Sequence, residues 1–167
     1  MKKILVLALV VVMALGLGGC AKKAKQEALL QYIDYDMTEL TILYDEMITS
    51  YNGVVSKNHI NDAVSYKEFR DNTKGKAEAA LKEAREVAAT IEDDELANIH
   101  NIFVEYLIGF DEALDMAIKL IEDTRPDQVE AVNKKLRELE AMRNEYQNKL
   151  VEYGKECDIE VTFSVVK

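Results

Sequence analysis

The chain lacks most of the residues that build a cross-linked or strongly turned fold. It has two Cys, one Pro, seven Gly and no Trp in 167 residues. Two Cys cannot provide the several disulfides on which small exported domains rely. A chain of this length can instead bury an apolar core of its own, so we expect one ordinary domain.

Groups that would carry catalysis or hold a metal are also scarce. The two His, His59 and His100, belong to no Glu-x-x-His or Cys-x-x-Cys-His motif. This argues against a carboxylate di-iron centre and against covalent haem. The sequence also has no Ser nucleophile elbow and no Gly-rich phosphate loop. We therefore expect no metal, no cofactor and no enzyme.

Basic residues are fewer than acidic ones. The chain has 21 Lys and Arg against 31 Asp and Glu, which gives a formal net charge of −10. Such an acidic surface disfavours nucleic acid, so we expect no nucleic-acid partner. Most of the carboxylates are expected on solvated helix faces, where they favour solubility.

The longest apolar run lies at the N-terminus. Lys2 and Lys3 precede an uncharged stretch from Ile4 to Leu17, which is the pattern of an export signal. Its 14 residues are fewer than the ~20 that a helix needs to cross a bilayer. The pattern therefore indicates a segment that directs export and does not itself span the membrane.

The run ends in Leu17-Gly18-Gly19-Cys20, which resembles the lipobox of bacterial lipoprotein precursors: an aliphatic residue, two small residues and a Cys. The resemblance covers residues 1–20. It implies that a signal peptide, residues 1–19, is cleaved between Gly19 and Cys20. It also implies a diacylglyceryl group on the Cys20 sulfur and a fatty acid such as palmitate on the new amino terminus. The expected product is extracytoplasmic and lipid-anchored to the bacterial membrane. The alternative is a short N-terminal membrane helix that carries Cys20 by chance.

Lipidation of Cys20 would leave Cys157 without a partner in the chain. An unpaired Cys in an exported protein can be buried and inert, can bridge to another chain, or can be reactive. We expect Cys157 to be buried, because Lys155 is the one basic neighbour in sequence that could stabilise a thiolate.

From about Gln26 onward the apolar residues recur in steps of three and four, as in helices that pack along a coiled-coil seam. Four segments share the pattern. Their boundaries are signalled by Asn52-Gly53, the capping-box pattern Ser65 to Glu68, the acidic run Glu92 to Glu95, Thr124 to Asp127 and Gly154. The seams comprise Leu30, Ile33, Met37, Leu40, Tyr44, Met47 and Tyr51; Tyr66, Thr73, Ala77, Ala80, Ala84, Val87 and Ile91; Leu96, Ile99, Phe103, Tyr106, Phe110, Ala113, Ala117 and Leu120; and Val129, Val132, Leu136, Leu139, Tyr146, Leu150 and Tyr153. His100 follows Ile99 directly, so we place it off the seam.

Four long helices with short connections predict an all-α fold, an antiparallel up-down-up-down four-helix bundle over residues 29–156. Residues 20–28 are expected to form the acylated Cys and a short tether. The alternative is a three-helix bundle with a loosely packed second helix, because the second seam is rich in Ala. With the first helix rising from Cys20, the loop Gly53 to Asn61 and the turn Glu122 to Arg125 lie distal to the membrane.

A short extended C-terminal tail, residues 157–167, completes the chain. Ile159, Val161, Phe163 and Val165 alternate with polar residues, as in a half-buried strand. We favour packing of the tail on the bundle, because a free apolar strand invites aggregation. Strand addition to a partner and contact with the bilayer interface remain the alternatives.

Tyr44, Tyr51, Tyr106, Tyr146 and Tyr153 fall on the seams. Arg143 occupies the one seam position of the fourth helix that is not apolar. The interpretation we favour is that the Tyr hydroxyls and the Arg143 head reach water at seam edges. The alternative is a ligand pocket formed by Tyr106, Arg143 and Tyr146, in which buried hydroxyls pair with one another or with a ligand.

The sequence therefore predicts a lipid-anchored bundle that acts by binding. One hypothesis is a protein-interaction module of the cell envelope, with a partner protein that contacts the distal loop around Val54, Val55 and His59 or the tail. The alternative is a small-ligand-binding, sensor-like bundle with a Tyr-lined pocket. A cavity between helices, lined by Tyr and Arg143, would favour the second hypothesis.

Overall fold

The computed structural model describes residues 4–6, 20–55, 63–123 and 125–166. The lipobox residues before Cys20 and the loop residue His59 lie outside these ranges. Residues 4–6 form a short strand, β1 (Ile4–Val6).

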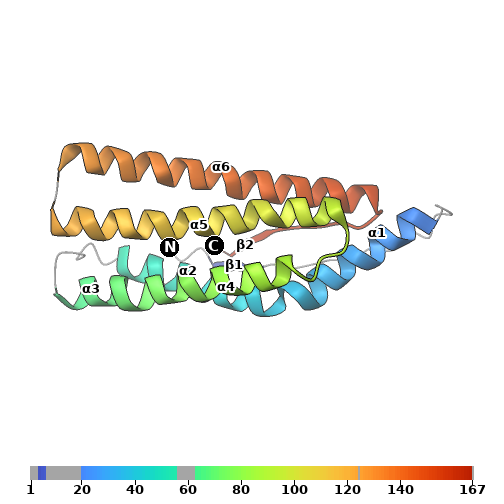
Figure 1. The fold of residues 1–167 in the computed structure, drawn as a ribbon, viewed down its shortest axis with the longest axis horizontal. Coiled ribbons are helices and arrows are strands. Elements are labelled where there is room, and N and C mark those ends of the chain that lie inside the picture. Colours follow the sequence, from blue (N-terminus) through green and yellow to red (C-terminus); the bar gives the residue numbers. More distant parts are fainter. Residues whose placement is uncertain (1–3, 7–19, 56–62, 124, 167) are drawn as a thin grey trace.

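Four helical arms account for most of the described chain, and they run alternately up and down (Figure 1). The first arm is continuous through α1 (Cys20–Gln31), the π-helical segment η1 (Tyr32–Asp36) and α2 (Met37–Val55). The second comprises α3 (Ala63–Lys67), the π-helical segment η2 (Glu68–Thr73) and α4 (Lys74–Ala88). The third and fourth are α5 (Asp94–Glu122) and α6 (Pro126–Glu156). The predicted all-α bundle is confirmed.

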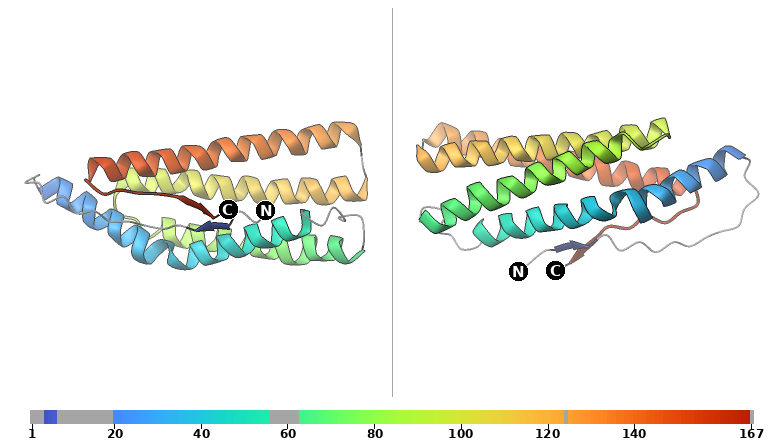
Figure 2. Two further views of the ribbon diagram at one scale, coloured as in Figure 1. Left: turned by 180° about the vertical axis from the view of Figure 1, so that it is seen from behind. Right: turned by 60° about the horizontal axis from the view of Figure 1, so that its bottom comes forward.

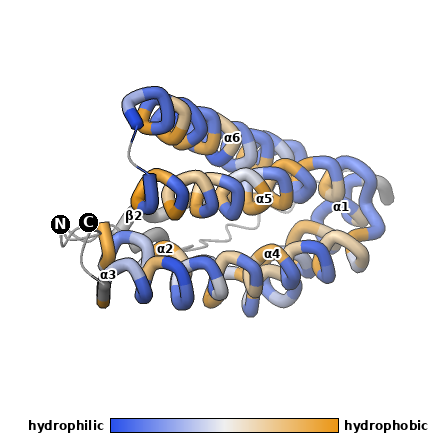
Figure 3. Tube along the Cα trace, turned by 60° about the vertical axis from the view of Figure 1, so that its left-hand side comes forward, coloured by the Kyte–Doolittle hydropathy of each residue, from blue (hydrophilic) through white to orange (hydrophobic). Residues whose placement is uncertain are grey.

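The arms pack in sequence order. α2 packs on α4, α4 on α5, and α5 on α6. Figure 3 shows α6 and α5 as one layer and α2 and α4 as the other. Because α4 is wedged between α2 and α5, with Ala77, Ala80 and Ala84 buried, the second arm is a full member of the bundle. The small Ala side chains let the backbones approach closely.

Two helix starts lie where the sequence predicts them. The Asp93 side chain caps α5 by accepting a hydrogen bond of 2.8 Å from the Leu96 N–H. Pro126 begins α6, where its missing N–H costs no helical hydrogen bond. The capping-box expectation at Ser65 is wrong, because Ser65 lies inside α3, which already begins at Ala63.

The π-helical segments shift the seams of the first two arms. Leu29 and Tyr32 are fully buried, whereas Leu30, which the seam pattern places in the core, is half-buried. In the second arm Phe69, absent from the predicted seam, is buried. A π-turn closes its hydrogen bonds from residue i to residue i+5, so each such turn contains one residue more than an α-helical turn. The apolar stripe therefore changes phase across it.

The C-terminal tail folds back onto the bundle through a tight turn after α6. The Ile159 N–H donates to the Gly154 carbonyl oxygen at 2.8 Å, and the Asp158 N–H donates to the Lys155 carbonyl oxygen at 3.2 Å. Asp158 has a φ of 56°. This is a Schellman C-cap with Asp in the position that Gly usually holds.

Ile159 and Val161 are buried, so the predicted packing of the tail on the bundle is confirmed for these residues. Gly154, expected to end the helix, lies instead in its last turn. A Cβ there would lie 2.7 Å from the Ile159 carbonyl oxygen. Gly154 is thus the place where the returning tail crosses α6. Further along, β2 (Ser164–Val166) pairs antiparallel with β1, with Ile4 opposite Val166 (Figure 2).

Two glycines offer a matched test of this crossing. Gly75→Ala, within α4, places its Cβ in open space, so it should raise the free energy of unfolding by about 0.5–1 kcal/mol. Gly154→Ala gains the same helix propensity but meets the tail, and overpacking costs about 1–3 kcal/mol. We expect net destabilisation, measured by urea denaturation of both variants. Equal stabilisation by the two changes would contradict the crossing.

At the Cys20 end, ion pairs connect three arms and the start of the tail. Lys25 Nζ lies 2.6 Å from a Glu95 carboxylate oxygen and 3.0 Å from one of Glu156. Lys22 pairs with Asp158. Since α1 begins at Cys20, residues 20–28 are helical and held to the bundle by these contacts.

Cys157 is fully buried beside this end, as expected, and Gln26 Nε2 donates to its carbonyl oxygen at 2.6 Å. Burial raises the pKa of the Cys157 thiol, so the thiol stays protonated and unreactive at neutral pH.

None of the helices in the described ranges is both long and apolar enough to span a bilayer.

Candidate ligand-binding site

A chain of buried hydrogen bonds joins all four arms. The His100 Nε2 lies 2.7 Å from the Ala84 carbonyl oxygen, and the His100 Nδ1 lies 2.8 Å from the Tyr32 hydroxyl. The Tyr32 hydroxyl lies 3.0 Å from that of Tyr146. Residues of η1, α4, α5 and α6 are thus connected through side chains in the core.

The chemistry of the partners assigns a direction to this chain. A carbonyl oxygen can only accept, so Nε2 of neutral His100 carries the proton and donates to Ala84. Nδ1 then accepts from the Tyr32 hydroxyl, and the Tyr32 oxygen accepts from the Tyr146 hydroxyl. Burial lowers the pKa of His100 and raises that of Tyr146 to about 12. Both groups are therefore neutral near pH 7.

His100 was expected to lie off the seam, and this is wrong: its side chain is completely buried. On α5 the core-facing stripe is wide enough to include both Ile99 and His100, because that helix packs against neighbours on two sides. Steps of three and four residues assign only one of two neighbouring residues to the seam, so they select Ile99 and leave His100 out.

A second pair of hydroxyls lies one layer further along the bundle. The Tyr44 and Tyr106 hydroxyl oxygens are 3.3 Å apart, and both side chains are buried. The Phe103 ring stacks on Tyr106 with centroids 5.8 Å apart. The favoured expectation that such hydroxyls reach water is therefore wrong for this pair and for Tyr146, and Tyr32, which was on no predicted seam, is buried with them. They pair with one another because the core leaves them no route to solvent.

Arg143 reaches inward from α6 beside this second pair. Burial raises the pKa of the Tyr44 hydroxyl, while its contact with Tyr106 and the Arg143 charge lower it. The Arg143 Nε is buried and has no hydrogen-bond partner in the described part of the chain. No carboxylate of the described ranges forms an ion pair with Arg143 either. A guanidinium that is partly desolvated and lacks a carboxylate is unusual, because burial of an uncompensated cation is costly.

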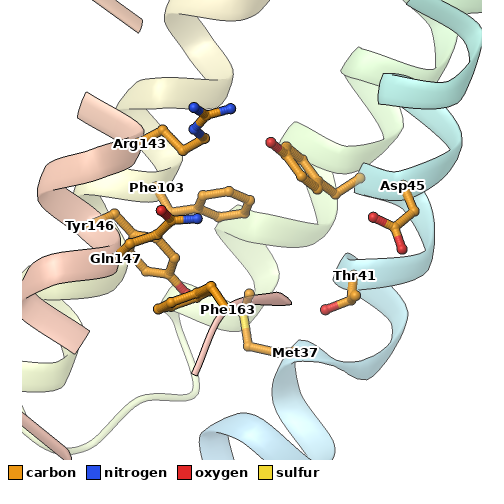
Figure 4. Close-up of a pocket in the computed structure, with 9 residues that line it drawn as sticks. Met37, Thr41, Asp45, Phe103, Arg143, Tyr146, Gln147 and Phe163 are labelled. Atoms are coloured by element: carbon orange, nitrogen blue, oxygen red, sulfur yellow. The ribbon is translucent and has the colours of Figure 1, made fainter. Parts of the chain in front are cut away.

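The Arg143 side chain faces a pocket between α2 and α6 (Figure 4). Phe103 of α5 lies at its back, and Phe163 of the tail closes it. The remaining lining residues come from the two flanking helices: Met37, Thr41, Tyr44 and Asp45 on α2, and Tyr146 and Gln147 on α6. Burial raises the pKa of Asp45, which is consistent with its place at the edge of this pocket.

The structure therefore brings the three predicted pocket residues into one region. Arg143 and Tyr146 line the pocket directly, and Tyr106 lies behind Tyr44, to which it is hydrogen-bonded. Asp45, Gln147 and Phe163 also line the pocket but were not predicted from the sequence. Asp45 and Gln147 lie next to the seam residues Tyr44 and Tyr146, which is the only signal that could have identified them.

The pocket is almost filled in this conformation. Its cavity is about 40 Å³, well below the ~150 Å³ of an apolar cavity that accepts benzene. The Phe163 ring forms part of the pocket wall and packs against Tyr146 with centroids 6.2 Å apart. In the described ranges, no cluster of three or more His, Cys, Asp or Glu could hold a metal ion.

Comparison of the chain with protein-family models, with curated proteins and with solved structures finds no match.

Proposed function

We propose that the protein is a lipid-anchored, extracytoplasmic binding protein of the bacterial cell envelope, whose pocket between α2 and α6 holds a small ligand with a negatively charged group. The observation that carries the proposal is the inward-facing Arg143 guanidinium, which has a buried Nε and no carboxylate partner in the described chain.

The electrostatics of the pocket favour an anion. A partly buried guanidinium recovers its lost hydration through a charge-assisted bond to carboxylate, sulfonate or phosphate oxygens. The aromatic walls of Phe103, Tyr44 and Tyr146 exclude water and so strengthen that bond. The Tyr44 and Tyr146 hydroxyls already pair with those of Tyr106 and Tyr32. In the described chain the Arg143 Nε has no such partner, so we assign recognition of the anion to Arg143.

The lipobox resemblance supports the anchor. Under this proposal Cys20 carries the diacylglyceryl group, and membrane lipid is the first partner of the protein. α1 begins at Cys20, and Lys25 of α1 forms ion pairs with α5 and α6. Under the proposal the folded domain therefore lies next to the lipid anchor, without a flexible tether between them.

A protein-interaction module is the second candidate. Tyr35 and Ile42 lie two turns apart on the first arm with 71% and 56% of their surfaces exposed, and a protein partner would bury both by contacting this face of the arm. Val54, expected at the contact surface, is buried. Crosslinking of the anchored protein in its native envelope would reveal such a partner.

Small anions test the proposed site directly. Addition of acetate, methanesulfonate or phosphate to the full mature protein should shift the NMR signal of the Arg143 Nε–H, whereas uncharged acetamide should not. Arg143→Gln should weaken anion binding at least tenfold, because the loss of a charge-assisted bond costs about 1.5–3 kcal/mol.

Arg137→Gln is the matched control, since Arg137 lies exposed on the same helix and its loss should leave binding unchanged. The proposal fails if none of the anions moves the Arg143 signal, or if Arg143→Gln binds them as tightly as the unmodified protein.

A further inference from the structure

We infer that the ligand is a monocarboxylate with an aromatic or bulky apolar group, and that it binds by taking the place of the Phe163 ring. The inference rests on the proposed function and specifies the class of ligand and the group that it displaces. Three features of the pocket carry it.

The first feature is charge. Among the described residues, Arg143 is the one cationic side chain that lines the pocket, and Asp45 lies on the opposite wall. One guanidinium matches one carboxylate in charge and in bidentate geometry. A dianion such as a phosphate monoester would carry a second negative charge toward Asp45 without a second cation to balance it. A singly charged carboxylate therefore fits better.

The second feature is the apolar wall. Met37, Phe103, Tyr146 and Phe163 form the apolar part of the pocket wall, and the Phe163 ring lies beside Tyr146 and Met37 (Figure 4). A phenyl ring is thus already accommodated in the place that the body of a ligand would take. An aromatic carboxylate reproduces the Phe163 contact with Tyr146 and adds the bond to Arg143 that Phe163 cannot make.

The third feature is the way the tail is attached. Ile159 and Val161 are buried and follow directly on the hydrogen-bonded turn at Gly154, whereas Phe163 is half-buried. The cost of exposing a side chain scales with the apolar area that returns to water. In the full chain β2, directly after Phe163, pairs with β1, but cleavage after Gly19 would remove β1. In the mature protein Phe163 can therefore leave its place while the tail stays held at Ile159 and Val161.

The size of the cavity requires this exchange. At about 40 Å³ the space left beside Phe163 is too small for a ring. A ligand with an apolar body must therefore compete with Phe163, so the affinity of the unmodified protein includes the cost of displacing its own side chain.

The test uses 3-phenylpropionate with the full mature protein and isothermal titration calorimetry. The unmodified protein should bind it more tightly than acetate and at least tenfold more tightly than 3-phenylpropan-1-ol or phenyl phosphate. Phe163→Ala should tighten binding of 3-phenylpropionate at least tenfold, because the competitor is gone. The double variant Phe163→Ala with Arg143→Gln should lose that gain.

Hydrogen exchange supplies a readout that does not depend on the variants. Binding of 3-phenylpropionate should speed amide exchange at residues 162–166 of the unmodified protein and leave exchange at Ile159 unchanged. The inference is overturned if Phe163→Ala binds 3-phenylpropionate no better than the unmodified protein does, or if phenyl phosphate binds better. If acetate still shifts the Arg143 signal in that case, the anion site stands and only the ligand class and the exchange with Phe163 are wrong. Loss of both responses removes the proposed function as well.

Discussion

His100→Ala should lower the free energy of unfolding by about 3–5 kcal/mol, a large share of the 5–15 kcal/mol that a domain of this size usually has. Truncation of a fully buried side chain leaves a cavity among the four arms. It also removes the acceptor of the Tyr32 hydroxyl and the donor to Ala84, which leaves buried polar groups without partners. Urea denaturation of the purified protein measures the change.

Asn101→Ala provides the control for this substitution. Asn101 is the next residue of α5 and is exposed, so its replacement should change stability by less than about 0.5 kcal/mol. A loss below about 1 kcal/mol for His100→Ala would show that the hydrogen-bonded chain contributes little to the bundle.

The same side chain makes stability depend on pH. Burial lowers the pKa of His100 below its ordinary value of 6.5. In acid the unfolded chain therefore takes up a proton at this position before the folded protein does, which favours unfolding. The stabilising contribution of His100 is complete above pH 6.5 and is lost as the pH falls toward the lowered pKa. The stability difference between the unmodified protein and His100→Ala should accordingly shrink between pH 7.5 and 5. Parallel pH profiles would contradict a neutral, buried His100.

Cys20→Ser should abolish incorporation of a labelled palmitate precursor and cause the uncleaved form to accumulate in cells. A Ser hydroxyl is a far weaker nucleophile than a thiolate, so it accepts no diacylglyceryl group. Two or more acyl chains hold a protein stably at a bilayer, whereas a single chain binds only marginally. The mature form should therefore be fully membrane-associated, and intact mass spectrometry should show both the lipid and the removal of residues 1–19.

The second Cys of the chain serves as the control. Cys157 is buried at the end of α6, so Cys157→Ser should leave palmitate labelling and cleavage unchanged. If Cys20→Ser is labelled and cleaved as efficiently as Cys157→Ser, the lipoprotein interpretation of the N-terminus is wrong.

The number, order and direction of the helices follow from the sequence, because a long apolar stripe with clear end signals leaves few alternatives. Asp93 and Pro126 mark helix starts within a residue of the predicted positions. The errors lie where local hydrogen bonding departs from a regular α-helix. The π-turn at Tyr32 and that at Phe69 change the phase of the stripe, and no step of three or four residues reveals such a change.

The candidate site could be predicted in part for a related reason. Tyr106, Arg143 and Tyr146 stand out because they are polar at apolar positions. The roles of His100 and Phe163 depend instead on which distant elements lie beside them, namely α4 at Ala84 and the tail over α6. The turn that returns the tail relies on Asp158 at a positive φ. A Gly there would have signalled the turn, but an Asp does not.

The first arm runs without a break from Cys20 to Val55. The length of this arm therefore sets the distance between Cys20 and the pocket. At about 1.5 Å per residue, the pocket residues around Thr41 stand ~30 Å along the helix from the attachment point. For a body that stands upright on an anchor at Cys20, that exceeds the depth of the lipid headgroup layer. A ligand would reach the pocket from the aqueous side of the envelope, without first entering the bilayer.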